Sequence, residues 1–115
     1  MAFQNALFDT GLDAMAAEIV SVSLHSADGG ATGSDELTGG TYARQTPTWG
    51  DASSGSVSTT APMSFDVPGG STVSHVGLWD SGPAWLGSIA LENSEQFAGD
   101  GEFTVTSVTI NAVNQ

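Results

Sequence analysis

The stretch Val57-Ser58-Thr59-Thr60-Ala61-Pro62-Met63-Ser64-Phe65-Asp66-Val67 alternates mostly apolar residues at the odd positions with polar residues and one proline at the even positions. A period of two is typical of a β-strand with one buried face, because successive side chains point to opposite sides of a sheet. The alternation therefore predicts a strand over residues 57–67, with Met63 and Phe65 in the core. Pro68-Gly69-Gly70 follows, and this turn chemistry ends the strand.

Other short stretches of the sequence predict the remaining strands. Apolar alternation or short apolar runs predict further strands over residues 20–25, 42–49, 73–79, 84–91 and 103–110. Residues 73–79 and 84–91 have apolar residues on both faces, so we expect central strands on either side of a turn at 80–83. Residues 42–49 contain Pro47 and are expected at an edge. The apolar residues of 103–110 change phase, which indicates a bulge near Ser107.

The N-terminal region has helical periodicity instead. Apolar residues recur at helical spacing at Leu7, Phe8, Leu12, Met15, Ala16 and Ile19. This predicts a helix from Asn5 to Glu18, in which Gly11 costs about 1 kcal/mol relative to alanine. One helix and six or seven strands predict a mainly β protein, an antiparallel β-sandwich or jelly-roll-like domain with one N-terminal α-helix. We expect a single domain overall, with residues 1–19 as an N-terminal arm and helix and residues 20–115 as the β-sandwich.

Charge excludes whole classes of partner. The 115 residues contain thirteen Asp and Glu against one Arg, no Lys and no Cys, for a formal net charge of −12. Nucleic-acid and anionic-membrane binding depend on Lys and Arg, so we expect no nucleic acid and no membrane as partners. No segment approaches the roughly 20 apolar residues that cross a bilayer. Such a surface suits docking onto a basic face of a larger protein.

The sequence signals for catalytic and metal-binding residues are weak. His25 and His75 are the only imidazoles, and both fall in predicted strands without a Gly-x-Ser-x-Gly elbow, so structural roles are favoured over a Ser-His-Asp triad. The acids Asp28, Asp35 and Glu36 could ligate calcium, but their loop lacks the EF-hand pattern. Glu92, Glu95 and Glu102 are expected at the surface rather than as a glycosidase pair. We therefore expect no catalytic residue, metal or cofactor.

The single arginine and the aromatic residues are the candidates for interaction. Arg44 favours bidentate pairing with a carboxylate, and the expected partner is Asp28, Asp35 or Asp80, with a neighbouring subunit as the alternative. The three tryptophans and Tyr42 could form a sugar-binding platform. Trp79 is expected in the core, whereas Trp49, beside Pro47 and Gly50, is the candidate for an exposed anchor.

Three stretches carry a resemblance to a known family: Leu24-His25-Ser26-Ala27-Asp28, Gly39-Gly40-Thr41-Tyr42-Ala43-Arg44 and Val73-Ser74-His75-Val76-Gly77-Leu78-Trp79-Asp80. In this order and spacing they resemble small virion proteins of tailed phages, described as head-decoration or tail-fibre proteins. The resemblance runs from about Val20 to the C-terminus, and its most specific part is the run from His75 to Asp80. No catalytic motif defines that family, so the resemblance implies a building block of a particle.

Together these observations predict a non-enzymatic virion structural protein. Our leading hypothesis is a decoration (cement) protein on the outer capsid surface that bridges capsid subunits. Its expected partners are the major capsid protein and copies of itself, with a trimer expected from the symmetry of capsid sites and analogy with other decoration proteins. The N-terminal segment, with Phe3, Leu7 and Phe8, is the candidate docking arm. The alternative is a tail-fibre or tail-tip module that contacts the host; a small hydrolase or glycan-binding module is less favoured.

Overall fold

In the computed structural model, residues 5–111 are described, apart from the side chains of residues 5, 6 and 8. This part of the chain forms one helix followed by seven strands. The elements are α1 (Asn5–Glu18), β1 (Ser21–His25), β2 (Ser56–Ser58), β3 (Met63–Val67), β4 (Thr72–Trp79), β5 (Trp85–Gln96), β6 (Gly101–Val105) and β7 (Thr109–Asn111). The bounds of α1 are those that the helical periodicity predicts.

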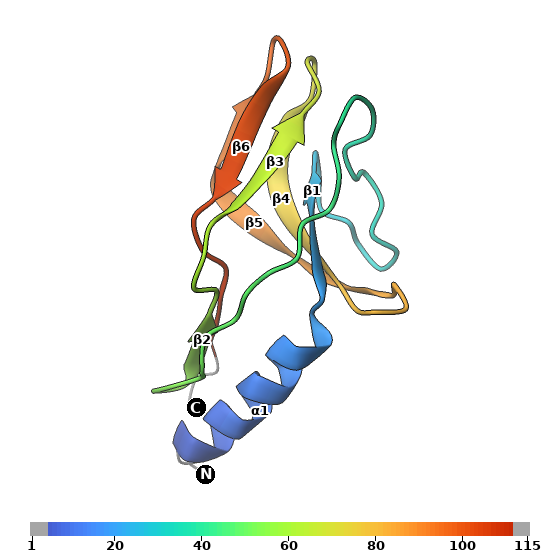
Figure 1. The fold of residues 1–115 in the computed structure, drawn as a ribbon. Coiled ribbons are helices and arrows are strands. Elements are labelled where there is room, and N and C mark those ends of the chain that lie inside the picture. The colour runs from blue at the N-terminus through green and yellow to red at the C-terminus, as the bar shows by residue number, and fades with distance from the viewer. Residues whose placement is uncertain (1–4, 112–115) are drawn as a thin grey trace.

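All strand pairs are antiparallel, and they form three sheets with the orders β1-β4-β5, β2-β7 and β3-β6. The β3-β6 pair lies across β4 and β5 as a second layer, and β2-β7 lies toward α1 at the other end of an elongated molecule (Figure 1). The predicted class, a mainly β, antiparallel, sandwich-like fold with one N-terminal helix, is therefore confirmed.

The main core lies between these layers. Phe65 is fully buried on β3, and it packs with the fully buried Val22 and Leu24 of β1 and Val73 of β4. The side chains of β3 are buried and exposed in turn, and Met63 and Phe65 point inward as predicted. Because two hydrophobic layers close over one another here, most of the apolar burial that stabilises the chain is at this interface.

The predicted strand over residues 57–67 is in fact two strands. β2 ends at Ser58 and β3 begins at Met63, and between them Ala61 is exposed. Pro62 has no N–H to donate to a ladder, which favours a break at this point. The two strands then pair with different partners, β2 with β7 and β3 with β6. The predicted bulge near Ser107 is likewise a break between β6 and β7.

Two other strand predictions were wrong. Residues 42–49 form no strand; single bridges pair Gln45 with Val22 of β1 and Trp49 with Thr59, the residue after β2. The segment predicted as a central strand at 84–91 is β5, which reaches Gln96 and lies at the edge of its sheet. It has apolar residues on both faces because Ile89 packs against the main core on one face and Trp85 packs against Trp79 on the other.

The helix is attached to the β2-β7 end through a small core of its own. Leu12 and Ala16 pack with Val57 of β2. On the same helix, the carboxylates of Asp9 and Asp13 accept hydrogen bonds from the backbone N–H groups of Gly55 and Ala52. No helix among the described residues is long and apolar enough to cross a membrane.

Candidate functional site

The fold brings together the three stretches that carry the family resemblance. β1 and β4 pair with Leu24 opposite Val76 and His25 opposite His75. The loop after β1 then returns along its other edge, where Leu37 N–H donates to Leu24 O and Gln45 N–H donates to Val22 O. The result is one cluster, hereafter the aromatic cluster, which consists of Ser23, His25, Glu36, Tyr42, Arg44, Trp79 and Trp85.

Arg44 is held from two directions within this cluster. Its Nε and Nη2 donate to the two oxygens of Glu36 at 3.0 and 2.8 Å, and its Cζ lies 3.8 Å from the ring centroid of Trp79. A bidentate carboxylate pair and a cation–π contact use the planar shape of the guanidinium fully. The predicted bidentate pairing is thus present, but the predicted partners Asp28, Asp35 and Asp80 were wrong. Glu36 lies nearest because its backbone bridges to β1 at His25.

Tyr42 completes the carboxylate site. Its hydroxyl donates to Glu36 Oε2 at 2.9 Å and accepts from the backbone N–H of Leu24 at 2.9 Å. Burial raises the pKa of Glu36, but hydrogen bonds from Arg44 and Tyr42 and the charge of Arg44 outweigh burial, and the pKa lies below its ordinary value. Burial and the neighbouring carboxylate raise the pKa of Tyr42. Glu36 is therefore held as a carboxylate and Tyr42 as a neutral phenol.

A second chain of hydrogen bonds runs through the buried side of the cluster. Trp79 Nε1 donates to Ser23 Oγ at 2.7 Å, and Ser23 Oγ lies 2.6 Å from His25 Nε2. Because an indole N–H can only donate, the Ser23 hydroxyl oxygen accepts this hydrogen bond. The Ser23 O–H then donates a hydrogen bond to His25 Nε2. His25 Nδ1 then donates to the backbone oxygen of Ser34 at 2.8 Å. We assign the Nδ1–H tautomer on this network.

This serine–histidine pair has no access to a substrate. Ser23 and His25 are both fully buried, and Trp85 covers His25 with ring centroids 5.1 Å apart. A nucleophilic serine needs a free approach to its oxygen, whereas Ser23 Oγ is already engaged on both sides. The pair therefore serves to satisfy polar groups inside the fold.

The other motif residues on β4 and directly after it also have local roles. Asp80 Oδ1 accepts from the backbone N–H groups of Ala84 and Gly82 at 2.6 and 2.8 Å, which closes the turn before β5. Those two hydrogen bonds lower the pKa of Asp80. His75 Nδ1 lies 2.8 Å from Ser74 Oγ and is half-buried. Trp79 is 8% exposed, so its predicted place in the core is confirmed.

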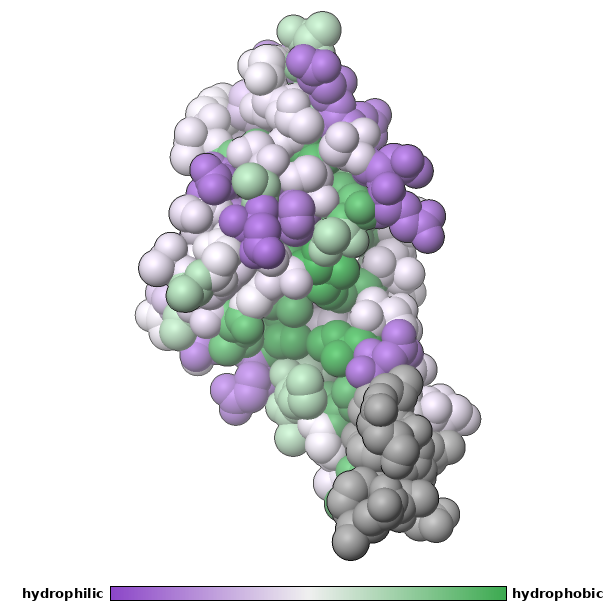
Figure 2. Space-filling view, turned by 180° about the vertical axis from the view of Figure 1, so that it is seen from behind, coloured by the Kyte–Doolittle hydropathy of each residue, from purple (hydrophilic) through white to green (hydrophobic). Residues whose placement is uncertain are grey.

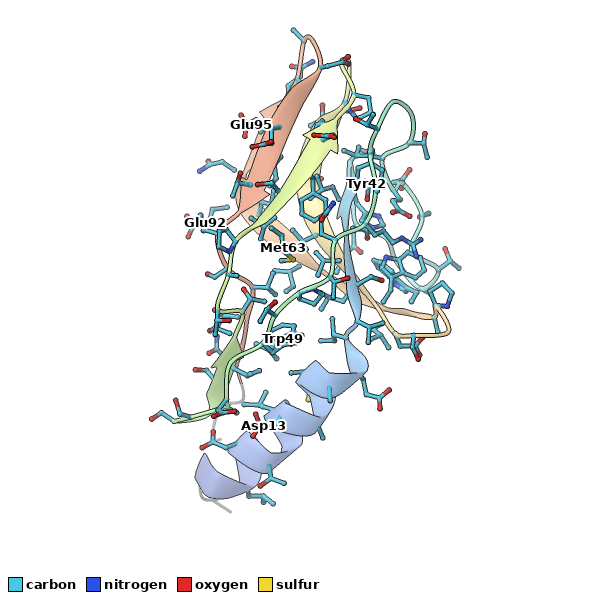
Figure 3. The ribbon with its side chains drawn as sticks, in the orientation of Figure 1. Asp13, Tyr42, Trp49, Met63, Glu92 and Glu95 are labelled. Atoms are coloured by element: carbon cyan, nitrogen blue, oxygen red, sulfur yellow. The ribbon has the colours of Figure 1, made fainter. Side chains whose placement is uncertain are left out.

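Trp49 is not the exposed anchor that its position beside Pro47 and Gly50 predicts. Its ring is half-buried between α1 and the sheets, where it packs against both cores, and its Nε1 donates to the backbone oxygen of Ile19 at 3.3 Å (Figure 3). The prediction failed because α1 folds back over this part of the chain. The three tryptophans therefore form no exposed platform.

The candidate docking arm can be placed only in part. Phe3 lies outside the described residues, and so does the side chain of Phe8. Leu7 is on α1 and 58% exposed. A docking role for this segment stays a prediction.

Acidic residues do not converge on a metal site. Among residues 5–111 no group of three or more His, Asp or Glu side chains is arranged to hold a metal ion. Asp28 instead accepts from Gly30 N–H and the Ser88 hydroxyl, and Glu36 is paired with Arg44. Glu92 and Glu95 are exposed on the flank of β5 (Figure 3).

One surface feature was not predicted, an apolar groove of about 600 Å³ that we name the β5 groove. Its apolar lining comes from α1 and the residue after it, β4, β5 and β7: Met15, Ile19, Leu78, Leu86, Ile89 and Ile110. A bulge places Leu86 between the pairs Leu78–Gly87 and Trp79–Trp85, and Gly87 has a φ of 149°. The bulge leaves Leu86 46% exposed. The sequence signal was the apolar stretch of residues 84–91, which contains Leu86 and Ile89 of this lining.

Comparison with known proteins agrees with the resemblance that the sequence motifs carry. No curated protein matches the chain. The sequence model of one family, described as Podophage GP4 fiber I protein gp80, matches residues 2–112. That match spans the helix and all seven strands, including each stretch that meets in the aromatic cluster. The chain therefore belongs to this family of phage virion structural proteins, the podophage fibre proteins.

Proposed function

We propose that this protein is a non-enzymatic structural subunit of the phage tail, in a fibre or at the tail tip. The observation that carries the proposal is the family match over residues 2–112, because the family's description names a fibre protein. It favours the tail-fibre alternative over the capsid-decoration hypothesis. The partners of such a subunit would be other virion proteins, including copies of the same chain.

The geometry of the aromatic cluster supports a structural role. Its ionic, hydrogen-bonding and aromatic groups satisfy one another inside the fold, and its one serine–histidine pair is buried. An enzyme site needs polar groups that converge on an open pocket. Here the polar groups fasten the loop of residues 26–45 onto β1 and β4 instead.

The test is to locate the protein on the virion through a single label. The sequence contains no cysteine, so Ala98→Cys in the exposed turn between β5 and β6 creates a unique thiol. Phage grown with this variant can be labelled with maleimide gold and imaged, with wild-type phage as the unlabelled control. We expect gold on the tail and few copies per particle. Gold spread over the capsid, with hundreds of copies, would restore the decoration hypothesis.

A second measurement separates the two roles by their consequences. Particles that lack the protein should lose adsorption to cells but keep capsid resistance to heat. Loss of capsid stability with normal adsorption would contradict the tail proposal.

A further inference from the structure

The first part of the loop after β1 covers the aromatic cluster with very little apolar material. We name residues 26–35 the glycine loop; they include Gly29, Gly30 and Gly33, and their alanine and threonine side chains are exposed. The loop lies along the right flank of the molecule in Figure 1, which is on the left in Figure 2, where white and purple residues predominate. A segment that buries few apolar side chains opens locally at low cost. Its closed position therefore depends on polar and aromatic contacts.

Side chains of β1 and β5 hold the glycine loop against the sheet. His25 Nδ1 donates to the backbone oxygen of Ser34 at 2.8 Å, and Trp85 Nε1 donates to the backbone oxygen of Gly30 at 2.9 Å. Gly33 is buried against Trp85, and a Cβ at this position would overlap the indole ring. Of these two side chains, only the His25 imidazole can change its charge between about pH 5 and pH 8.

The hydrogen bonds around His25 fit a neutral ring. His25 is fully buried, its Nδ1–H donates to Ser34, and its Nε2 accepts from the Ser23 hydroxyl. The Ser23 oxygen in turn accepts from the indole N–H of Trp79. A proton added at Nε2 would deprive the Ser23 O–H of its acceptor. Burial of an unpaired donor together with a new positive charge is costly, so the closed loop disfavours the charged ring.

The charged groups around His25 do little to stabilise a positive ring. Glu36 bridges to His25 from the returning chain, but its carboxylate is already paired with Arg44 at 2.8 Å, so the positive guanidinium offsets its attraction for the ring. His75 lies opposite His25 on β4, and its own protonation would add a like charge. Asp28 of the glycine loop interacts with His75. The His25 ring therefore becomes charged at low cost only where water reaches it.

We propose that His25 is a pH sensor that keeps the glycine loop closed at neutral pH and releases it when the ring is protonated. A histidine ring in water takes up a proton near pH 6.5. Below that pH the open loop binds a proton that the closed loop excludes, so acid favours opening. A fall from pH 7.5 to pH 5.0 then raises the opening equilibrium about 30-fold. The inference goes beyond the proposed function and is independent of it, because it concerns the isolated chain.

The experiment is hydrogen exchange of the indole N–H groups of the full chain, followed by NMR at about pH 7.5 and pH 5.0. The N–H of Trp79 is buried and bonded to Ser23 beneath the glycine loop, so its exchange reports opening. The N–H of Trp49 is bonded to Ile19 beside α1 and is the internal control. After correction for the exchange rate of a free indole at each pH, Trp79 should exchange about 30-fold faster at the lower pH, and Trp49 should change less than about threefold.

Two matched variants identify the sensor. His25→Gln cannot take up a proton and should remove the pH dependence of Trp79 exchange, whereas His75→Gln removes the other imidazole and should keep it. The nitrogen NMR shifts of the His25 ring give a reading that needs no variant, and at neutral pH they should show the Nδ1–H tautomer. The pKa of Asp28 is lowered by its hydrogen bond from Gly30, and the pKa of Glu36 also lies below its ordinary value, so this pH range changes mainly the histidines.

Three outcomes would overturn the proposal. The first is a wild type in which Trp79 exchange changes less than about threefold, or no more than Trp49 exchange, since the loop would then not open on its own. The second is a His25 ring that becomes charged while Trp79 exchange stays slow, because the closed cluster would then accept the proton. The third is a folded His25→Gln variant that keeps the pH dependence. If that variant does not fold, the exchange and ring shifts of the wild type decide alone.

Discussion

Replacement of Gly77 by alanine tests how the aromatic cluster is built. Gly77 is buried in β4, and a Cβ there would overlap Ser23 Oγ, His25 Nε2 and the ring of Trp85. Ser23 and His25 are fully buried and hydrogen-bonded, so neither can move away freely. Forcing a methyl group into a packed interior costs about 1–3 kcal/mol. A broken Ser23–His25 hydrogen bond would add about 1–3 kcal/mol for the unsatisfied groups.

The expected loss is therefore about 2–6 kcal/mol in the free energy of unfolding, a large part of the roughly 5–15 kcal/mol typical of a domain. Urea unfolding followed by tryptophan fluorescence and by circular dichroism measures it. Gly11→Ala is the matched control, because Gly11 is exposed on α1 with open space around it. That change should stabilise the protein by about 0.5–1 kcal/mol. A Gly77→Ala variant within about 0.5 kcal/mol of the wild type would refute the reasoning.

Three further predictions concern the core, pH and charge. Phe65→Ala should cost about 3–5 kcal/mol by urea unfolding because Phe65 is fully buried, whereas Ser64→Ala on the exposed face of β3 should be nearly silent; equal midpoints for the two variants would show that the facing is wrong. The pKa of Glu36 is lower in the folded chain than its ordinary value of 4.5, so the stability it contributes at neutral pH should be lost as the pH falls through the folded pKa, and melting temperatures from pH 7 to pH 3 should fall less steeply in Glu36→Gln; parallel curves would contradict this. The protein should not shift DNA or RNA in a low-salt mobility assay, because its net charge is −12 and Arg44 is occupied, and salt-sensitive binding at micromolar concentration would count against it.

Periodicity was enough to predict the elements whose partners are all on one side. The bounds of α1 and the inward facing of Met63 and Phe65 followed from the sequence because a helix or strand with one buried face repeats its apolar residues at the period of its backbone. Trp79 was placed correctly for a different reason, because it ends an apolar strand whose last four residues are all buried. In the 57–67 stretch, Pro62 was the one local signal of the break between β2 and β3. The alternation on both sides of Pro62 led us to predict one continuous strand instead.

The predictions that failed depend on contacts between residues that are far apart in the sequence. Whether residues 84–91 lie at the centre or the edge of a sheet depends on which strands pair beside them, and apolar residues on both faces fit either place. The partner of Arg44 depends on how the loop after β1 returns, which brought Glu36 rather than Asp28, Asp35 or Asp80 into reach. Trp49 was covered by a helix that lies about thirty residues earlier in the chain. A single sequence does not indicate which of these distant residues lie close together in space.

The most specific part of the family resemblance, the run from His75 to Asp80, lies mostly in the interior. From Val76 to Trp79 every residue is buried, and Asp80 closes the turn that follows. Substitutions in that run are therefore expected to lower stability, and loss of infectivity in such a variant would say little about what the protein binds. A partner surface has to be tested with exposed residues, where a charge can be added without disturbing either core. Leu86 and Ala98 are two such positions, since both are exposed.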